Sequence, residues 1–184
     1  MKRCSKCKEE KEFSEFWVNR KAKSGYNFSC KQCEQVTREK NKETKKRLKW
    51  EKFNIEVQKE YSEILNSDSP EEVWKDIPKF NGEYQASSLG RIRQMPMVYK
   101  HKNIYKRTKY RILKAFLSHV GYYTITLTNK ETGYKVSRGV HRWVMFAFHG
   151  EREESIQVNH INGVKDDNRL ENLEYMTGVE NMHY

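Results

Sequence analysis

The sequence predicts an α+β protein built from four consecutive segments. Three observations point to this organisation: two Cys-x-x-Cys pairs near the start, a stretch from Glu34 to about Leu65 without proline or glycine, and alternating apolar and polar residues from Tyr122 to Thr128. They predict a small metal-supported module, a long helix and a half-buried antiparallel strand, respectively. The expected segments are a cysteine module at 1–36, a basic helix and linker at 37–70, a small antiparallel β platform with a short helix at 71–150, and two strands followed by a helix at 151–184.

Charge indicates the class of partner. The 184 residues include 36 Lys and Arg against 25 Asp and Glu, a net charge of +11, which favours a polyanionic partner. Residues 1–50 and 101–150 each carry +9, whereas 151–184 carry −5. This layout suits a protein that grips phosphates and attracts a divalent cation, and solvated surface charge is the plainer alternative.

Hydropathy argues against a membrane partner. The longest apolar run, Trp143 to Phe148, has six residues, far fewer than the ~20 that a membrane-spanning helix needs. The basic residues after Met1 lead into a cysteine pair instead of an apolar stretch, so no secretory signal is predicted. We expect a protein of the reducing cytoplasm.

The four cysteines form two matched pairs, Cys4 with Cys7 and Cys30 with Cys33, separated by 22 residues. Each Cys-x-x-Cys turn can bring two thiolates to one ion, and four sulfurs close a tetrahedral shell, which predicts structural Zn²⁺. A pair of disulfides and a redox motif are the competing interpretations. The spacing resembles a treble-clef or zinc-ribbon module whose second pair opens the long helix.

The helix from Glu34 has two different halves. Its later half carries an apolar stripe that needs a packing partner; the stripe consists of Trp50, Phe53, Val57, Tyr61 and Ile64. Its earlier half, Thr37 to Lys49, is basic without such a stripe, so it either lies along a DNA groove or is simply solvated. The candidate DNA contacts in this half are Arg38, Lys45, Lys46 and Arg47. Asn66 to Pro70 then predicts a helix stop and a linker.

The β platform is expected to feed a short buried helix. The alternating strand ends at a turn over Asn129 to Gly133, which leads into a second strand from Tyr134 to Ser137. Apolar residues then recur at helical spacing from Val140 to Phe148, and Gly150 stands where a helix C-cap glycine belongs.

The last segment carries the most specific pattern: Val158 to Gly163, Asp166 to Tyr175 and Thr177 to Asn181. Here the chain resembles the HNH endonucleases of phage- and intron-encoded homing type. Local sequence agrees, because residues 156–158 and 173–176 can pair as strands and Thr177-x-x-Glu180 forms a capping box that starts a helix. The expected fold of this segment is therefore a ββα-metal motif with Asn181 on the first helical turn.

The resemblance implies hydrolysis of a DNA phosphodiester. It assigns His160 as the general base that activates water and Asn172 as the brace of the loop that carries it. Asn159 and Asn181 occupy the positions that hold the catalytic cation, Mg²⁺ or Mn²⁺. His160 and that cation are expected on either side of the scissile phosphate.

Both ligand positions depart from the family's commonest residues, Asp and His, because neutral amides stand there. We therefore expect weak binding of the cation. The residues that might strengthen the site are Asp166, Asp167 and His183.

A second resemblance lies upstream, in Trp74 to Pro78 and Asn81 to Arg93. These stretches resemble the nuclease-associated modular motif that precedes HNH domains in homing endonucleases. The motif implies a strand-and-turn platform whose arginines, together with a Lys/Arg-rich loop from Lys100 to Arg111, face phosphates. The candidate contacts are Arg91, Arg93, Lys106, Arg107 and Lys109.

The sequence thus predicts a metal-dependent HNH endonuclease that acts on double-stranded DNA, in a bacterial cytoplasm if it is phage-encoded. Two alternatives stay open: a regulatory DNA-binding protein with a degenerate HNH fold, and a nuclease directed at RNA or at a particular DNA structure. The recognition sequence, the choice between nicking and double-strand cleavage, and the choice between monomer and dimer are not determined by the sequence.

Overall fold

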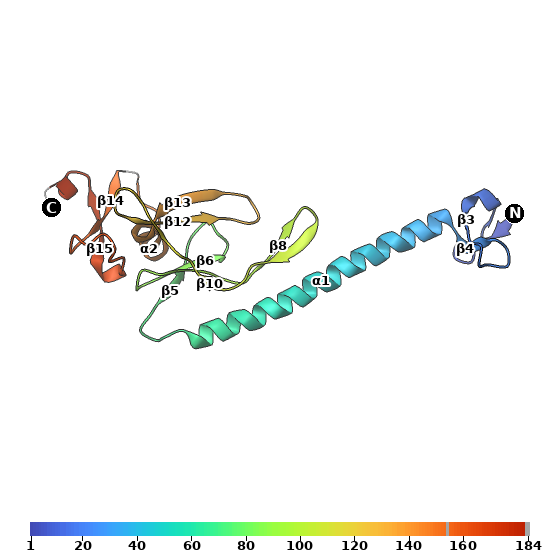
Figure 1. Ribbon diagram of the computed structural model, residues 1–184, viewed down its shortest axis with the longest axis horizontal. Coiled ribbons are helices and arrows are strands. Elements are labelled where there is room, and N and C mark those ends of the chain that lie inside the picture. The colour runs from blue at the N-terminus through green and yellow to red at the C-terminus, as the bar shows by residue number, and fades with distance from the viewer. Residues whose placement is uncertain (154, 183–184) are drawn as a thin grey trace. The chain divides into compact units, whose positions relative to one another are not determined.

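The computed structural model describes residues 1–153 and 155–182, and it has a mixed α/β fold (Figure 1). The chain divides into two compact units, Met1–Glu51 and Lys52–Tyr184, which are described separately. Helix α1, Lys31–Ser67, contributes residues to both units. No helix in the described part of the chain combines the length and the apolar character needed to cross a membrane.

The N-terminal unit consists of short β-strands, which precede α1 in the sequence, and of the first half of α1. Strand β1 (Lys2–Arg3) pairs antiparallel with β2 (Glu10–Lys11), and β3 (Phe16–Val18) pairs with β4 (Tyr26–Cys30). A 3₁₀ turn, η1 (Phe13–Glu15), precedes β3. The only buried apolar cluster among its described residues consists of Cys4, Phe16 and Cys30, with Tyr26 and Cys33 against it. This cluster is too small to stabilise a fold by apolar burial alone.

Helix α1 confirms the predicted long helix and begins three residues earlier than expected, directly after β4. Its first half is largely exposed. In the second half, Val57 and Ile64 are buried, which bears out these two members of the predicted stripe, whereas Trp50 is 42% exposed. Glu60 of this half accepts hydrogen bonds from the Arg107 side chain (3.3 Å) and the Tyr110 backbone N–H (3.1 Å).

The second unit contains a four-stranded antiparallel sheet in the order β10-β7-β6-β5. Its strands are β5 (Trp74–Asp76), β6 (Tyr84–Ser87), β7 (Ile92–Gln94) and β10 (Arg111–Ile112). Between β7 and β10, strands β8 (Val98–His101) and β9 (Ile104–Arg107) form a separate hairpin. The Lys/Arg-rich region expected as a loop is therefore largely a two-stranded ribbon.

A three-stranded sheet, β11 (Phe116–Leu117), β12 (Tyr123–Thr128) and β13 (Lys135–Gly139), leads into helix α2 (Val140–His149). The predicted hairpin and helix are confirmed. Asn129 starts the turn because its side-chain oxygen accepts the backbone N–H groups of Glu131 and Thr132. Gly150 ends α2 at a φ of 80°, with its N–H donated to the carbonyl of Phe146.

The core of this unit lies where α2 packs against β6, β12 and β13 (Figure 1). Trp143 is 1% exposed, and its indole N–H donates to the carbonyl of Ile125 at 3.0 Å. The other fully buried apolar members are Ile77, Phe80, Ala86, Ile92, Leu127 and Val144. Because α2 also contacts β14 and β15, this core holds the C-terminal strands in place.

The C-terminal strands are β14 (Ile156–His160) and β15 (Leu173–Thr177), an antiparallel pair that confirms the predicted pairing. A 3₁₀ turn, η2 (Leu170–Asn172), precedes β15. The predicted capping box is present, because Glu180 Oε2 accepts the Thr177 N–H at 2.8 Å and the Thr177 hydroxyl accepts the Glu180 N–H at 3.3 Å. Within the described residues the helix that follows is one 3₁₀ turn, η3 (Glu180–Met182).

Candidate active site

The end of β14 places its last two residues on opposite faces. Asn159 lies opposite Glu174 in the strand register and His160 lies opposite Leu173. Successive side chains of a strand point to opposite sides, so His160 shares its face with Val158, and Asn159 shares its face with Gln157. The apolar face packs toward the core and carries His160 inward.

His160 is buried, with 5% of its surface exposed. Its ring lies 5.9 Å from that of Tyr122 and 5.0 Å from that of His141, centroid to centroid. Burial lowers the pKa of His160, which favours the neutral imidazole that a general base requires.

One polar contact favours one tautomer of His160. Its Nε2 lies 3.4 Å from the side-chain oxygen of Asn168. The Asn168 amide is oriented by its own N–H, which donates to the carbonyl of Asp166 at 3.0 Å. Because an amide oxygen can only accept, the contact is a hydrogen bond in the tautomer with the proton on Nε2, which leaves the lone pair on Nδ1.

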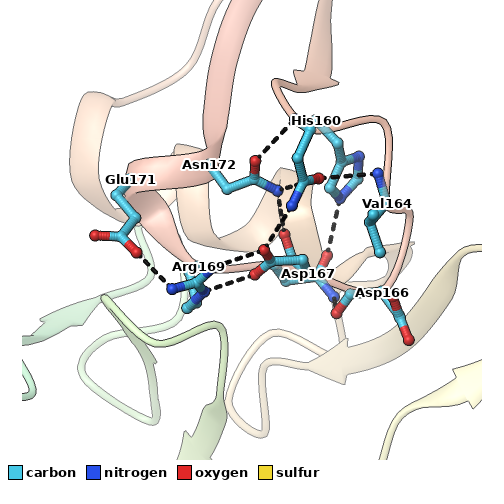
Figure 2. Close-up of polar contacts among 9 residues, drawn as sticks. His160, Val164, Asp166, Asp167, Arg169, Glu171 and Asn172 are labelled. Carbon is cyan, nitrogen blue, oxygen red and sulfur yellow. Dashed lines mark hydrogen bonds and ion pairs between the residues drawn. The ribbon is translucent and has the colours of Figure 1, made fainter.

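Asn172 braces the loop after β14, as Figure 2 shows. Its side-chain N–H groups donate to Asn162 Oδ1 and to the carbonyl of Asp167, both at 2.9 Å. Its oxygen accepts the backbone N–H of Asn162 at 3.0 Å. All the hydrogen-bonding ends of this 7% exposed amide are thus used to fix the loop, the geometry expected of the residue that supports His160.

A second network closes the outer side of the loop. The Arg169 guanidinium makes two 2.8 Å contacts with Asp167 and a 2.6 Å contact with Glu171 (Figure 2). These hydrogen bonds to Arg169, set against partial desolvation, hold the pKa of Asp167 far below its usual range. Because Asp167 is engaged in this way, Asp166 is the freer of the two carboxylates considered for the cation; His183 lies outside the described residues.

Asn159 and Asn181 present amide oxygens that could hold a cation. The Asn159 N–H donates to Glu174 Oε1 at 3.0 Å, and the Asn181 N–H donates to Gln157 Oε1 at 2.7 Å. Among the described residues, neither Asn159 Oδ1 nor Asn181 Oδ1 accepts a hydrogen bond. Oxygen donors of this kind fit Mg²⁺, and Glu174 places a carboxylate beside the first of them.

The structure therefore divides the expected site between two faces of β14. Asn159, and Asn181 through Gln157, belong to one face, whereas His160 belongs to the other and is buried. Gln157, the partner of Asn181, precedes His160 by three residues in β14. The expectation that His160 and the cation lie on either side of the scissile phosphate stays a prediction.

The four cysteine sulfur atoms of the N-terminal unit all lie within 4.8 Å of one another. A tetrahedron with Zn–S bonds of about 2.3 Å has S–S edges of about 3.8 Å, so the cluster fits zinc. All four cysteines are free thiols. Burial opposes ionisation of Cys4, but backbone N–H donors from Cys30, Cys7 and Lys6 outweigh it and lower its pKa to about 6.

The predicted DNA contacts fall into two groups. Those on the first half of α1 and in the β8–β9 region are mostly exposed: Arg38, Lys45, Lys46, Arg47, Lys106 and Lys109. Arg107 is 29% exposed and pairs with Glu56 and Glu60, which fastens the ribbon to α1. Arg91 pairs with Glu72 but remains about half exposed.

The expectation for Arg93 is wrong. Its side chain is fully buried, donates to both oxygens of Asp68 and to Gln85, and stacks on the Trp74 ring. A guanidinium held in this way cannot meet a phosphate. Its long-range partner, Asp68, lies 25 residues away in the sequence, which is why the motif alone did not indicate this pairing.

Sequence reasoning missed the residues that surround His160. His141 is 6% exposed, and its Nδ1 is buried without a hydrogen-bond partner in the described part of the chain. A Cβ at Gly139 would lie 2.4 Å from His141 Cε1, so glycine is needed there to admit the ring. The available signal was a histidine at the start of a helix that otherwise reads as apolar core.

Comparison with known proteins identifies two matching segments in the second unit. Residues 72–128 match the NUMOD4 motif, and residues 138–183 match the HNH endonuclease family. An uncharacterized HNH endonuclease of Acanthamoeba polyphaga mimivirus is 34% identical over 122 residues, 65% of this chain and 27% of that protein. The DNA endonuclease I-HmuI of Bacillus phage SP01 is 32% identical over 111 residues, 59% of this chain and 56% of that protein.

A solved structure of I-HmuI describes DNA binding and cleavage by that HNH homing endonuclease. Its sequence is 32% identical to this chain, and the alignment covers 60% of this chain and 56% of the I-HmuI chain, with a TM-score of 0.46. The chain spans about a quarter to a half of the length of the curated relatives it matches. It carries a NUMOD4 motif followed by an HNH endonuclease domain and is homologous to I-HmuI and to the viral HNH endonuclease.

Proposed function

We propose that this protein is a metal-dependent endonuclease of the homing type that hydrolyses phosphodiesters in double-stranded DNA. One observation carries the proposal: the segment that matches the HNH family holds a buried imidazole with a lowered pKa at the end of β14, together with two amide oxygens, Asn159 Oδ1 and Asn181 Oδ1, that accept no hydrogen bond from the described residues. Hydrolysis of a phosphodiester needs a base for the attacking water and positive charge against the developing negative charge. His160 would supply the first, and the oxygens of Asn159 and Asn181 would hold the cation that supplies the second.

In the proposed mechanism, the Nε2–H group of His160 donates a hydrogen bond to the side-chain oxygen of Asn168. Nδ1 is then the nitrogen that accepts a proton from water. Asn172 keeps the loop that carries this pair in one conformation. Because His160 is buried, the attacking water has to reach Nδ1 at the end of β14, where substrate would bind. A Mg²⁺ or Mn²⁺ ion in this position would stabilise the negative charge on the phosphate and on the leaving 3′ oxygen.

The neighbouring segments are given binding roles. The β14–β15 pair with the helix begun by the capping box is proposed as a ββα-metal motif, and the four-cysteine cluster as a treble-clef or zinc-ribbon module that holds one structural Zn²⁺. The exposed basic side chains of α1 and of the β8–β9 ribbon are proposed to contact DNA; a two-stranded ribbon is narrow enough to enter the major groove. The site of action is the cytoplasm, of a bacterial host if the gene is phage-borne.

The experiment that tests the function is incubation of the full chain with supercoiled plasmid in Mg²⁺ and, separately, in Mn²⁺. One active site acts on one strand, so a monomer yields open-circular product, whereas linear product indicates a dimer or two successive cuts. Duplex DNA left intact in both metals, at concentrations that bind it fully, would contradict the proposal.

The second candidate is a DNA-binding protein without catalysis. It is favoured by the burial of His160 and by the neutral residues at both ligand positions. The two candidates differ in metal dependence: the binding protein retains duplex DNA without converting it to any product. An RNA-directed activity is separated by competition between duplex DNA and RNA of matched length.

A further inference from the structure

A pocket of about 450 Å³ lies beside the catalytic strands and has no part in the site described so far. Its walls carry three arginines from three different segments: Arg138 on β13, Arg142 on α2, and Arg152 in the loop that follows α2. Ile156, Val158 and Tyr175 also line it. The pocket therefore combines an apolar floor with three guanidinium groups and with two carboxylates, those of Glu151 and Glu153.

The floor of the pocket belongs to the same face of β14 as His160. Ile156 and Val158 precede His160 by four and two residues in a continuous strand. At a rise of about 3.3 Å per residue, Ile156 lies about 13 Å and Val158 about 7 Å back along the strand from His160. Arg142 follows His141, whose ring contacts that of His160.

The guanidinium groups retain donors for a ligand. Arg142 is exposed and makes no hydrogen bond or ion pair within residues 1–153 and 155–182. Arg138 reaches Glu151 only at 3.7 Å, because Lys79 holds the other oxygen of that carboxylate at 2.6 Å. Glu151 is thus partly neutralised by a lysine outside the pocket lining.

Tyr175 fixes the part of the pocket that carries Arg152. Its hydroxyl donates to the carbonyl of Gly150 at 3.0 Å, which ties down the start of the loop that carries Arg152. The Arg152 guanidinium lies over the Tyr175 ring, 5.3 Å from its centroid. The flat side of this arginine is therefore occupied, while its N–H edges stay available.

We propose that this pocket binds the sugar–phosphate backbone of the DNA strand that is cut, about one to two nucleotides from the scissile phosphate. The spacing follows from the 7–13 Å along β14, because neighbouring phosphates of one strand wind around the duplex and are about 7 Å apart through space. Guanidinium forks match pairs of phosphate oxygens, and the apolar floor suits the deoxyribose between them. The inference rests on the proposed function, because it defines the position of the pocket relative to the cut.

The test is the salt dependence of binding to a duplex of about 30 base pairs, measured without divalent cations for the full chain. Arg142→Ala and Arg152→Ala are each expected to lower the slope of log affinity against log salt by about 0.9, the value for one lost phosphate contact. Arg142→Lys keeps the charge and should keep the slope. Thermal melting confirms that each variant is folded, and Arg142, being exposed, is expected to tolerate either change.

The matched control is Lys135→Ala, which removes an exposed positive charge from the other end of β13, outside the pocket. Its slope should equal that of the wild type. If Lys135→Ala and Arg142→Ala lower the salt slope equally, the effect comes from diffuse surface charge. If neither arginine variant changes the slope, these arginines contact no phosphate. Either result overturns the pocket assignment.

The two proposals fail separately. If the wild-type protein does not cut DNA but the salt slope falls in both arginine variants, the proposed function is contradicted and the phosphate-binding pocket is supported. If the wild-type protein cuts DNA but the salt slope is unchanged in those variants, the proposed function is supported and the pocket assignment is contradicted. Once the cut is mapped, a neutral methylphosphonate placed one to two nucleotides from it should weaken wild-type binding and leave binding by Arg142→Ala unaffected.

Discussion

Gly90 packs directly against the backbone of Asn168: a Cβ atom added at Gly90 would lie 2.7 Å from the carbonyl carbon and oxygen of Asn168. Close by, the Leu170 N–H donates to the carbonyl of Ser88 at 2.8 Å. The turn between β6 and β7 thereby holds the loop whose Asn168 orients His160. The NUMOD4 region is thus connected to the HNH domain at the residue next to the proposed base.

Gly90→Ala should therefore reduce cleavage more than it reduces DNA binding. The new methyl group meets backbone atoms, which cannot rotate away, so the Asn168 segment has to shift and the His160 hydrogen bond is lost. The expected effect is at least about tenfold on the cleavage rate of bound substrate, since misplaced catalytic groups cost that much or more. The measurement is single-turnover cleavage with protein in excess over DNA.

Gly133→Ala is the matched control for backbone strain. Gly133 has a φ of 76°, close to the 82° of Gly90, but nothing lies within 4 Å of its added Cβ. Both alanines cost roughly 1 kcal/mol of backbone strain, whereas only Gly90→Ala should impair cleavage. Equal effects of the two variants would show that the Gly90–Asn168 contact has no part in catalysis.

His141 should make the protein less stable in acid. Burial, followed by the nearby His160 and Arg142, lowers its folded-state pKa from 6.5 to about 3. The unfolded chain therefore binds a proton that the folded chain refuses, and the free energy of unfolding falls as the pH drops from 6.5 toward 3. The contribution is at most about 1.4 kcal/mol per pH unit.

Chemical denaturation at several pH values between 7 and 4, following the second unit, measures this contribution. His141→Leu should flatten the dependence relative to the wild type while removing the unpaired Nδ1. If the two proteins lose stability in parallel as the pH falls, His141 titrates normally and is not held neutral by burial.

Asn159→Asp should strengthen the catalytic cation site. The substitution replaces a neutral amide by a carboxylate beside Glu174, and ligand charge is a main determinant of affinity for hard cations. The concentration of Mg²⁺ that gives half-maximal cleavage is expected to fall by about tenfold. Without Mg²⁺ the variant should be less stable, because the Asn159–Glu174 hydrogen bond becomes a contact between two carboxylates.

Asn41→Asp adds the same charge on the exposed first half of α1 and serves as the control. Its Mg²⁺ requirement should match that of the wild type. If Asn159→Asp does not change the Mg²⁺ concentration needed for half-maximal cleavage, Asn159 is not a ligand of the cation.

The N-terminal unit should depend on zinc for its fold. Its buried cluster is small and is made largely of the cysteines themselves, so loss of the metal leaves little to stabilise it. Purified protein should contain one Zn²⁺ per chain, and Cys30→Ser should make residues 1–50 sensitive to proteolysis while the second unit stays resistant. Four freely reactive thiols in the native protein would contradict the zinc assignment.

Sequence was a good guide where local physics decides the structure. The turn at Asn129, the glycine that ends α2 and the Thr177–Glu180 capping box all depend on near neighbours, and each was found where the pattern predicted it. Arg93 was misjudged because its ion pair joins Asp68, the residue directly after α1, to β7 across the fold. A buried guanidinium and an exposed one look the same in a sequence.

The surroundings of His160 were similarly hidden from the sequence. The rings beside it come from Tyr122 and His141, which reach it only after β12 and α2 have packed together. The order of His160, Asn172 and Asn181 could be read from the resemblance, and the opposite faces of Asn159 and His160 follow from side-chain alternation along a strand. Burial of the base depends on tertiary contacts. The same holds for the contact of Gly90 with Asn168.

The central claim is that the imidazole of His160 activates the water that attacks DNA, and comparison of His160→Ala with wild-type protein in single-turnover cleavage tests it most directly. The account predicts a rate loss of about 10² to 10⁴ at unchanged DNA affinity, with His119→Ala, an exposed histidine outside the site, cutting like the wild type. Cleavage by His160→Ala at the wild-type rate would contradict it.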